Sequence, residues 1–304
     1  MAGKIVVVGS LNMDLVACAA RIPVAGETLT GHTFFDDPGG KGANQAYAAA
    51  RLGGRVAMLG RVGSDDYGRR MRANLEQAGC DVSGVLALPD CASGIAVIFV
   101  ADNGQNSIII MPGANGRFSP EDVEGAEDRF KGAAIVLLQL ENPLPTVMAA
   151  TRAACRAGAR VILDPAPAQK LPDELLHLVH VLTPNETEAA ILAGLAPGRL
   201  DPPHAMAIAH SLQERGASTV IVKLGEQGCV LAGQGAARHL PAPRVEAVDT
   251  TAAGDVFNAG LAVALSEGAD LLRACEFANR AAAVSVTRRG THAAAPTREE
   301  VGGL

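Results

Sequence analysis

Continuous runs of apolar residues recur along the chain and alternate with alanine-rich stretches. The runs are KIVVVGS, RVAMLG, AIVLLQL, RVILDPA, VHVLTPN and TVIVKLG, and the stretches between them include NQAYAAARLG, TVMAATRAACRAGA, ETEAAILAGL and HAMAIAHSLQERG. Apolar runs of this kind are typical of parallel strands buried on both faces, and the alanine-rich stretches have helical character. The alternation predicts an α/β fold with a doubly wound, mostly parallel sheet flanked by helices. Ligands of such sheets bind beyond the carboxyl ends of the strands.

Two segments interrupt this alternation. ETLTGHTFFDDPGG predicts a strand near Thr28 to Phe35, and SGIAVIFVADNGQNSIIIMPGAN holds two β-rich runs around Asp102-Asn103-Gly104, which is a hairpin turn signal. We expect residues of about 12–38 and 91–115 to form a small β-sheet lid. The lid would belong to a single domain that spans residues 1–304.

Composition narrows the class of protein. The 304 residues are 48% hydrophobic and 19% charged, which suits one large α/β domain. A net charge of −6 does not attract nucleic acid or an anionic membrane to the protein. The aromatic content of 3% argues against surfaces on which nucleic-acid bases stack. We find no leader pattern, so we expect a cytoplasmic protein. The six cysteines lack metal-like spacing and indicate neither disulfides nor zinc.

The stretch VDTTAAGDVFNAG carries two carboxylates, Asp249 and Asp255, on either side of small residues. Asp249 or Thr251 could be an ordinary helix cap, but a cap does not explain Asp255. A helix that begins after small residues exposes backbone N–H groups, which attract anions. The stretch therefore predicts a phosphate-binding turn with Asp255 beside it.

PGGKGANQ and GSLNMD are two further candidate ligand-binding segments. The glycines of PGGKGANQ would let the backbone approach a small ligand, with Lys41 and Asn44 as donors, although glycine-rich turns also open many ordinary helices. Asn12 and Asp14 are two positions apart and face the same side of an extended segment, where they are either turn formers or acceptors for hydroxyl groups. Glu141 ends an apolar run and is a third acceptor at the ligand-facing edge.

Two more polar turns follow apolar runs. TPNETE reads as a helix start with early acidic residues, but a carboxylate there could also order magnesium-bound water. KLGEQG is either a plain hairpin or a contact for nucleotide phosphate.

The order of these segments resembles the ribokinase-like (PfkB-type) sugar kinase family. GSLNMD, PGGKGANQ, QLEN, DPAPA, TPNETE, KLGEQG, DTTAAGD and TRRG follow the family's order from about Lys4 to about Glu300. The resemblance implies an ATP-dependent kinase that phosphorylates the 5-hydroxyl of D-ribose to give D-ribose 5-phosphate and ADP. It also implies Mg²⁺ with ATP, K⁺ as a monovalent activator and a homodimer formed through the lid sheets.

The resemblance also implies roles for individual residues. Asp255 would be the catalytic base, and Ala252, Ala253 and Gly254 would form the anion hole. The sugar would be bound by Asn12, Asp14, Gly40, Lys41, Asn44, Glu141 and Asp255. ATP would be bound by Asn185, Lys223, Gly225, Gly228, Gly254 and Asn279, with Glu188 acting on Mg²⁺ through water. The K⁺ loop would comprise Asp249, Thr251, Ser285, Arg288, Gly290 and Ala294.

Departures from the family pattern leave alternatives. Alanine stands in the anion hole where glycine is familiar, and Ala294 lacks the hydroxyl expected at the last position of the K⁺ loop. A kinase for deoxyribose or another small sugar is the first alternative, because a site rejects an analogue lacking one hydroxyl only if a buried partner is left unpaired. A non-catalytic sugar-binding regulator is the second, since fold does not fix function.

Overall fold

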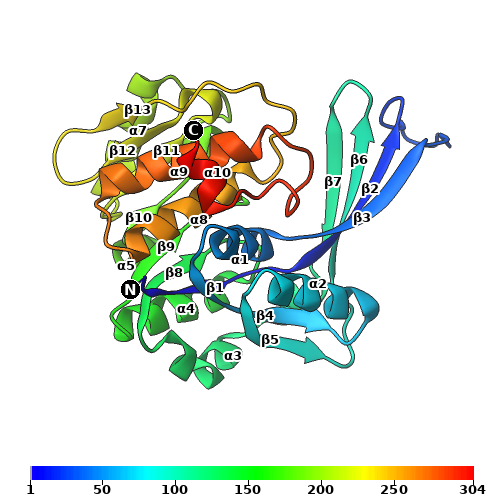
Figure 1. The fold of residues 1–304 in the computed structure, drawn as a ribbon, viewed down its shortest axis with the longest axis horizontal. Helices are drawn as coiled ribbons and strands as arrows, with labels where there is room; N and C mark the ends of the chain where they lie inside the picture. Colours follow the sequence, from blue (N-terminus) through cyan, green and yellow to red (C-terminus); the bar gives the residue numbers. More distant parts are fainter. Residues whose placement is uncertain (1) are drawn as a thin grey trace.

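A nine-stranded sheet runs through the centre of the molecule in the computed structural model, which describes residues 2–304 (Figure 1). Its strand order is β13-β12-β11-β10-β9-β8-β1-β4-β5, parallel from β11 to β5 and antiparallel at β12 and β13. The strands are β1 (Lys4–Val8), β4 (Arg55–Gly63), β5 (Asp81–Leu88), β8 (Ala133–Leu138), β9 (Arg160–Leu163), β10 (Val181–Leu182), β11 (Val220–Lys223), β12 (Cys229–Ala232) and β13 (Arg238–Leu240). The mostly parallel sheet predicted from the apolar runs is confirmed.

Helices cover both faces of this sheet. One face carries α1 (Lys41–Arg51), α2 (Asp66–Gln77), α8 (Ala253–Ser266), α9 (Leu271–Ser285) and α10 (Arg298–Gly302). The other carries α3 (Pro120–Gly125), α4 (Leu144–Arg156), α5 (Asp173–Leu178), α6 (Glu186–Leu192) and α7 (Pro202–Glu214). Three short 3₁₀ helices, Gly113–Arg117, Glu127–Phe130 and Gly225–Gln227, lie in connections.

Strand β1 shows why the apolar runs are continuous. Ile5 and Val7 belong to the core under α1 and α8, whereas Val6 and Val8 belong to the core under α4. Alternate side chains of a strand point to opposite faces, so a strand between two helical layers needs apolar residues at every position. None of these four side chains is more than 2% exposed.

A second sheet of four strands projects from this body (Figure 1). Its order is β3-β2-β6-β7, built from β2 (Asn12–Ala19), β3 (Thr33–Gly39), β6 (Gly94–Ala101) and β7 (Asn106–Met111). The β6–β7 hairpin turns at Gly104, as Asp102-Asn103-Gly104 predicts. The strand expected near Thr28 to Phe35 is partly wrong, because it begins at Thr33 and continues through Asp36, Asp37 and Pro38. Pairing with β2 keeps these poor strand formers extended.

The glycines before and within α1 approach the protein's own backbone. A Cβ on Gly40 would lie 2.7 Å from the Asn12 nitrogen, and one on Gly42 would lie 2.6 Å from the Ser10 nitrogen. Gly40 also has φ of 90°, a backbone conformation that favours glycine. These glycines therefore let α1 pack closely against the turn after β1, and their approach to a ligand stays a prediction. Among the described residues, no helix combines the length and apolar character that a membrane crossing requires.

Candidate active site

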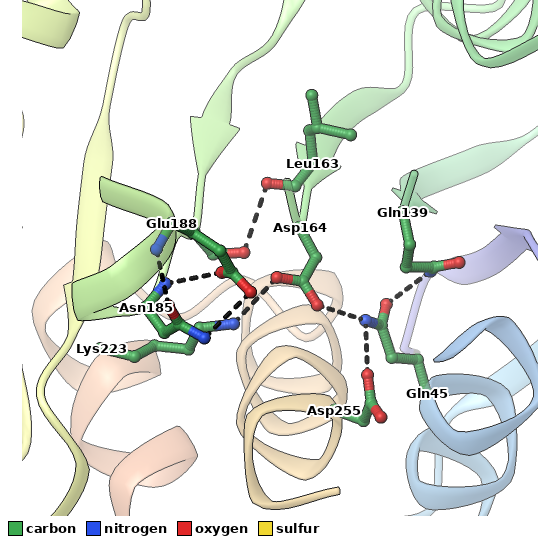
Figure 2. A network of polar contacts seen from close by, with 9 residues as sticks. Gln45, Gln139, Leu163, Asp164, Asn185, Glu188, Lys223 and Asp255 are labelled. Carbon is green, nitrogen blue, oxygen red and sulfur yellow. Dashed lines mark hydrogen bonds and ion pairs between the residues drawn. The ribbon is translucent and has the colours of Figure 1, made fainter. Parts of the chain in front are cut away.

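Polar side chains converge where the carboxyl ends of the central strands meet the N-terminal ends of α1 and α8. Ser10 follows β1, Glu141 follows β8, Asp164 follows β9 and Asn185 follows β10. Because parallel strands end at a common edge, residues far apart in sequence become neighbours there. Figure 2 shows part of the resulting network of polar contacts.

Glu141 joins the turn after β1 to the start of α1. Its Oε2 accepts hydrogen bonds from Ser10 Oγ at 2.5 Å, from the Lys41 backbone N–H at 3.1 Å and from Asn12 Nδ2 at 3.5 Å. Asn115 Nδ2 in turn donates to Asn12 Oδ1 at 2.8 Å. The carboxylate thus occupies the N-terminal end of α1, where the helix dipole favours negative charge.

Asp14 lies beside this group on β2. A Cβ on Gly39 would lie 2.3 Å from Asp14 Oδ2, so the neighbouring strand leaves room for the carboxylate. Within residues 2–304 the carboxylate accepts no hydrogen bond, which leaves its oxygens available to a ligand. Burial, followed by the negative charges of Glu141, Asp37 and Asp255, raises the pKa of Asp14 to about 7.

Asp255 is buried in the first turn of α8 and is held by two amides of α1. Asn44 Nδ2 donates to Oδ2 and Gln45 Nε2 donates to Oδ1, each at 3.0 Å. Burial raises the pKa of Asp255, while the positive charge of Lys41 and the two amide hydrogen bonds oppose that shift. A carboxylate with a raised pKa is a stronger base, which suits proton abstraction from a hydroxyl group.

Lys41 is surrounded by carboxylates. Burial alone would lower its pKa, but the negative charges of Asp255, Asp164, Glu141 and Glu188 together raise it. The ammonium group therefore stays charged in the middle of an acidic site.

Helix α8 begins without a side-chain cap. Ala252 occupies the N-cap position in the left-handed region, with φ of 57° and ψ of 10°, and is the one non-glycine residue of the described chain with positive φ. The capping role considered for Asp249 or Thr251 is therefore wrong. A non-glycine residue in this region is strained, and such strain is found at functional sites. Ala252, Ala253 and Gly254 all line a cavity of about 390 Å³, which Lys41, Asp164 and Asp255 also line.

A second cavity of about 610 Å³ adjoins the first. Lys223, Gly225 and Gly254 line both. The turn Gly225–Gln227 connects the antiparallel strands β11 and β12, so KLGEQG is a hairpin that also borders a cavity. The larger cavity has these further lining residues: Glu226, Gln227, Gly228, Ala242, Pro243, Arg244, Val245, Ala247, Thr250, Ala253, Phe257, Asn279, Ala282, Ala283 and Val286. Its walls are more apolar than polar and also carry charged and amide side chains, which suits a flat heterocycle with polar edges.

Asn185 and Glu188 cap helix α6 reciprocally. Asn185 Oδ1 accepts from the Glu188 N–H at 2.8 Å, while Glu188 Oε2 accepts from the Asn185 N–H at 2.8 Å. The helix-start interpretation of TPNETE is thus confirmed as a capping box. Both residues also line the smaller cavity, so the cap does not remove them from the site.

Asp249 ties together the loops before α8 and after α9. Oδ1 accepts from the N–H and hydroxyl of Thr251, and Oδ2 accepts from the Gly290 N–H at 3.0 Å. Partial burial would raise the pKa of Asp249, but these hydrogen bonds lower it, so the carboxylate is charged. In the same loop the Arg288 N–H donates to the Ser285 carbonyl, and Ala294 is buried.

Three polar contacts of the site had no assigned role in the sequence. Ser10 binds Glu141, Gln45 binds Asp255, and Asp164 binds Lys223 at 2.9 Å. All three lie within segments that carry the family resemblance. The sequence could have identified Asp164 as a site residue, because it directly follows an apolar run and therefore lies at the ligand-facing edge of the sheet.

Comparison with known proteins identifies the class to which this fold and site belong. The family model described as pfkB family carbohydrate kinase matches residues 2–298, and the chain belongs to this family. The chain is 41% identical to the ribokinase of Haemophilus influenzae, over 99% of this chain and 97% of that protein. It is 40% identical to the deoxyribokinase of Salmonella typhimurium, over 97% and 96% of the two chains. The structure of Arabidopsis thaliana ribokinase complexed with ribose and ATP matches with a TM-score of 0.92 and 35% identity, covering 100% of this chain and 98% of that one.

Proposed function

We propose that this protein is an ATP-dependent ribokinase that phosphorylates the 5-hydroxyl of D-ribose to give D-ribose 5-phosphate and ADP. The observation that carries the proposal is the position of Asp255, a buried carboxylate with a raised pKa directly after the first residues of α8. ATP as the phosphoryl donor makes the cytoplasm the expected location. The relatives named as ribokinases support ribose as the acceptor.

The sugar is proposed to bind among the acceptors and donors around Lys41. Asn12, Asp14 and Glu141 would receive or orient hydroxyl groups, Gly40 would contribute its backbone, and Asn44 would bridge the sugar to the base. Asp255 removes the proton of the 5-hydroxyl as the oxygen attacks the γ-phosphorus. Lys41 and Asp255 also line the smaller cavity, so the acceptor hydroxyl would face the donor phosphate there.

The start of α8 is proposed to stabilise the transferring phosphoryl group. Ala252, Ala253 and Gly254 line the smaller cavity, and the helix dipole favours negative charge at its N-terminal end. Phosphoryl transfer depends on positioning and electrostatic stabilisation, with little covalent chemistry by the protein. Backbone donors fixed by the left-handed turn at Ala252 would need no rearrangement during the reaction.

The larger cavity is proposed to bind the nucleotide. Its apolar walls would hold adenine, with Asn279 as a polar contact. Gly225 and Gly228 would admit the ribose and phosphates close to the backbone. Asn185 and Lys223, which border the smaller cavity, would contact the phosphates.

Magnesium is proposed to enter with ATP near Glu188. The donor set fits, because Mg²⁺ keeps most of its waters and takes one or two carboxylates. Both oxygens of Glu188 already accept from Asn185, which favours contact through water over direct ligation. When bound, the ion would neutralise charge on the phosphates.

The sugar specificity is tested by an ADP-release assay with ribose, deoxyribose, fructose and adenosine as acceptors. We expect ribose to give the highest kcat/KM. A preference for deoxyribose would instead support the alternative favoured by the 40% identity to a deoxyribokinase. Release of no ADP with any acceptor would support a non-catalytic sugar-binding protein.

Activation by K⁺ is expected despite the alanine in the cation loop. The carboxylate of Asp249 and the carbonyls of Thr251, Ser285, Arg288 and Gly290 are hard oxygen ligands, and water can replace the hydroxyl that Ala294 lacks. An ion there would order the loop next to the anion hole, so K⁺ should raise kcat more than it changes ribose affinity. The measurement is a KCl titration with choline chloride holding ionic strength constant. A flat rate would leave Asp249 as a structural link between two loops.

A homodimer through the second sheets is expected because that sheet exposes apolar side chains at its edges. All six residues of the edge strand β7 are exposed, including Ile108 at 52% and Ile109 at 59%, and Phe34 on β3 is 68% exposed. An uncovered apolar edge strand favours association. Sedimentation at micromolar concentration should give a dimer, and Ile109→Asp should shift it toward monomer. A monomeric parent protein would contradict the proposal.

A further inference from the structure

The carboxylate of Asp164 lies between the polar groups of the two proposed substrates. Its Oδ1 accepts from Lys223 Nζ at 2.9 Å, and its Oδ2 accepts from Gln45 Nε2 at 3.0 Å (Figure 2). The side chain is only 3% exposed. Both oxygens are therefore committed to protein donors on two different elements, α1 and the end of β11.

Gln45 connects this carboxylate to the proposed base. Its Nε2 donates to Asp164 and to Asp255 at 3.0 Å each, while its Oε1 accepts from Gln139 Nε2 at 2.7 Å. Ionised carboxylates only accept hydrogen bonds, so the two acids fix the amino end of the Gln45 amide toward themselves and leave its oxygen to accept from Gln139. The side chain of Gln45 is fully buried and has no alternative solvent partner.

Lys223 connects the same carboxylate to the nucleotide side. It lines both cavities, and a Cβ on Gly254 would lie 3.4 Å from its Nζ. The ammonium group thus stands at the N-terminal end of α8. Its backbone is fixed as well, because the Lys223 N–H donates to the Pro184 carbonyl at 2.8 Å.

An ion pair this sheltered is a weak source of stability by itself. The cost of removing two charges from water offsets their attraction, and apolar residues of similar size often serve folding equally well. The pair between Asp164 and Lys223 also stands beside the proposed anion hole and base. A role in the reaction therefore explains the position of this ion pair better than a contribution to the stability of the fold.

We propose that Asp164 is a positioning residue that links the two halves of the phosphoryl-transfer site. Through Oδ1 it holds the ammonium of Lys223 toward the phosphates of ATP, and through Oδ2 and Gln45 it holds the carboxylate of Asp255 toward the sugar hydroxyl. This proposal rests on the proposed kinase function. In the reaction, the hydroxyl proton passes to Asp255, the new O–P bond forms, and the bond to the leaving oxygen breaks with its electron pair staying on ADP. Lys223 would offset negative charge on the phosphate side.

The linkage has an electrostatic consequence for Asp255. Lys41 faces it from α1 and lowers its pKa, whereas burial and the negative charge of Asp164 raise it. Asp14 on β2 is also close enough to interact with it. Neutralising Asp164 should therefore lower the pKa of Asp255 and move the acid limb of the kcat profile, measured at saturating ribose, to lower pH. If Asp164 only stabilised the fold, the acid limb of the profile would stay at the same pH.

The test uses Asp164→Asn, Lys223→Gln and the double variant. In Asp164→Asn only one side-chain oxygen is left to accept a hydrogen bond. The new NH₂ group therefore faces the N–H donor of either Lys223 or Gln45, and that contact is repulsive. The double variant replaces the ion pair with a neutral amide pair and leaves no unpaired buried charge. It therefore keeps the test possible if a single variant fails to fold. Asp122→Asn is the matched control, because it removes the sheltered ion pair with Arg61, and neither residue lines either cavity.

The parent enzyme is first assayed with ribose and ATP, which tests the proposed function separately. We expect kcat to fall at least about tenfold in Asp164→Asn and in the double variant, by the loss of preorganised electrostatics. The ribose KM should change less than about twofold, the ATP KM should rise in Lys223→Gln, and the acid limb should shift in Asp164→Asn. A folded double variant with parental kcat, or a lowered kcat with an unmoved acid limb, would overturn the proposal. Asp122→Asn should keep the parental kinetics.

Discussion

Replacing Asp255 with Asn is expected to lower kcat by at least ~10²-fold, the typical contribution of a general base. The amide keeps nearly the same size and can still pair with Asn44, but it cannot accept the proton of the attacking hydroxyl. Because the substituted group acts mainly in the transition state, kcat and kcat/KM should fall together. The measurement is steady-state ADP release with saturating ATP.

Two controls separate this effect from misfolding. Circular dichroism and thermal unfolding should match the parent, and calorimetric titration should show that ribose still binds. Turnover close to the parental value in a folded Asp255→Asn variant would remove Asp255 from the mechanism. It would also remove the observation on which the proposed function depends.

Ribose binding is expected to weaken as the pH falls through about 7, because the pKa of Asp14 is raised to about 7. The ionised carboxylate accepts two hydroxyl groups, whereas the protonated form gives up part of that capacity. The fraction of protein with Asp14 ionised is nearly complete above this pKa and falls below it. The apparent Kd should therefore rise by up to about tenfold for each pH unit below 7, until it levels off at the affinity of the protonated form. Calorimetric titration of ribose without ATP isolates this effect from the ionisation of the reacting complex.

Two variants test the assignment of this titration to Asp14. Asp14→Asn should weaken ribose binding by about 10- to 100-fold, since a hydrogen bond to a charged group contributes about 1.5–3 kcal/mol, and the pH dependence near 7 should disappear. Asp37→Asn should retain binding and move the transition to lower pH, because the charge of Asp37 contributes to the raised pKa. A pH dependence that persists in Asp14→Asn would assign the titration to another group.

Local sequence signals predicted most of the elements and one turn. The apolar runs identified six of the nine strands of the central sheet, because a strand covered on both faces must be apolar throughout, but they did not identify β5, β12 or β13. Asp102-Asn103-Gly104 predicted the β6–β7 hairpin, because its turn needs positive φ and Gly104 supplies it. Local signals did not predict where β3 begins and ends. Asp36 to Pro38 have low strand propensity and are extended because they pair with β2.

The amino-acid sequence by itself indicated the protein family and a set of candidate site residues. The tertiary structure decided how these residues meet, and it added Ser10, Gln45 and Asp164 to them. The order of motifs was sufficient to indicate a sugar kinase, because residue type and spacing persist in a linear comparison. The contacts among Gln45, Asp164 and Lys223 were not visible, since 119 residues separate the first pair and 59 the second. The strand order β9-β10-β11 brings Asp164 and Lys223 together, and the packing of α1 against the same edge of the sheet adds Gln45. The left-handed start of α8 at Ala252 likewise contradicts local preference, and the surrounding fold must impose it.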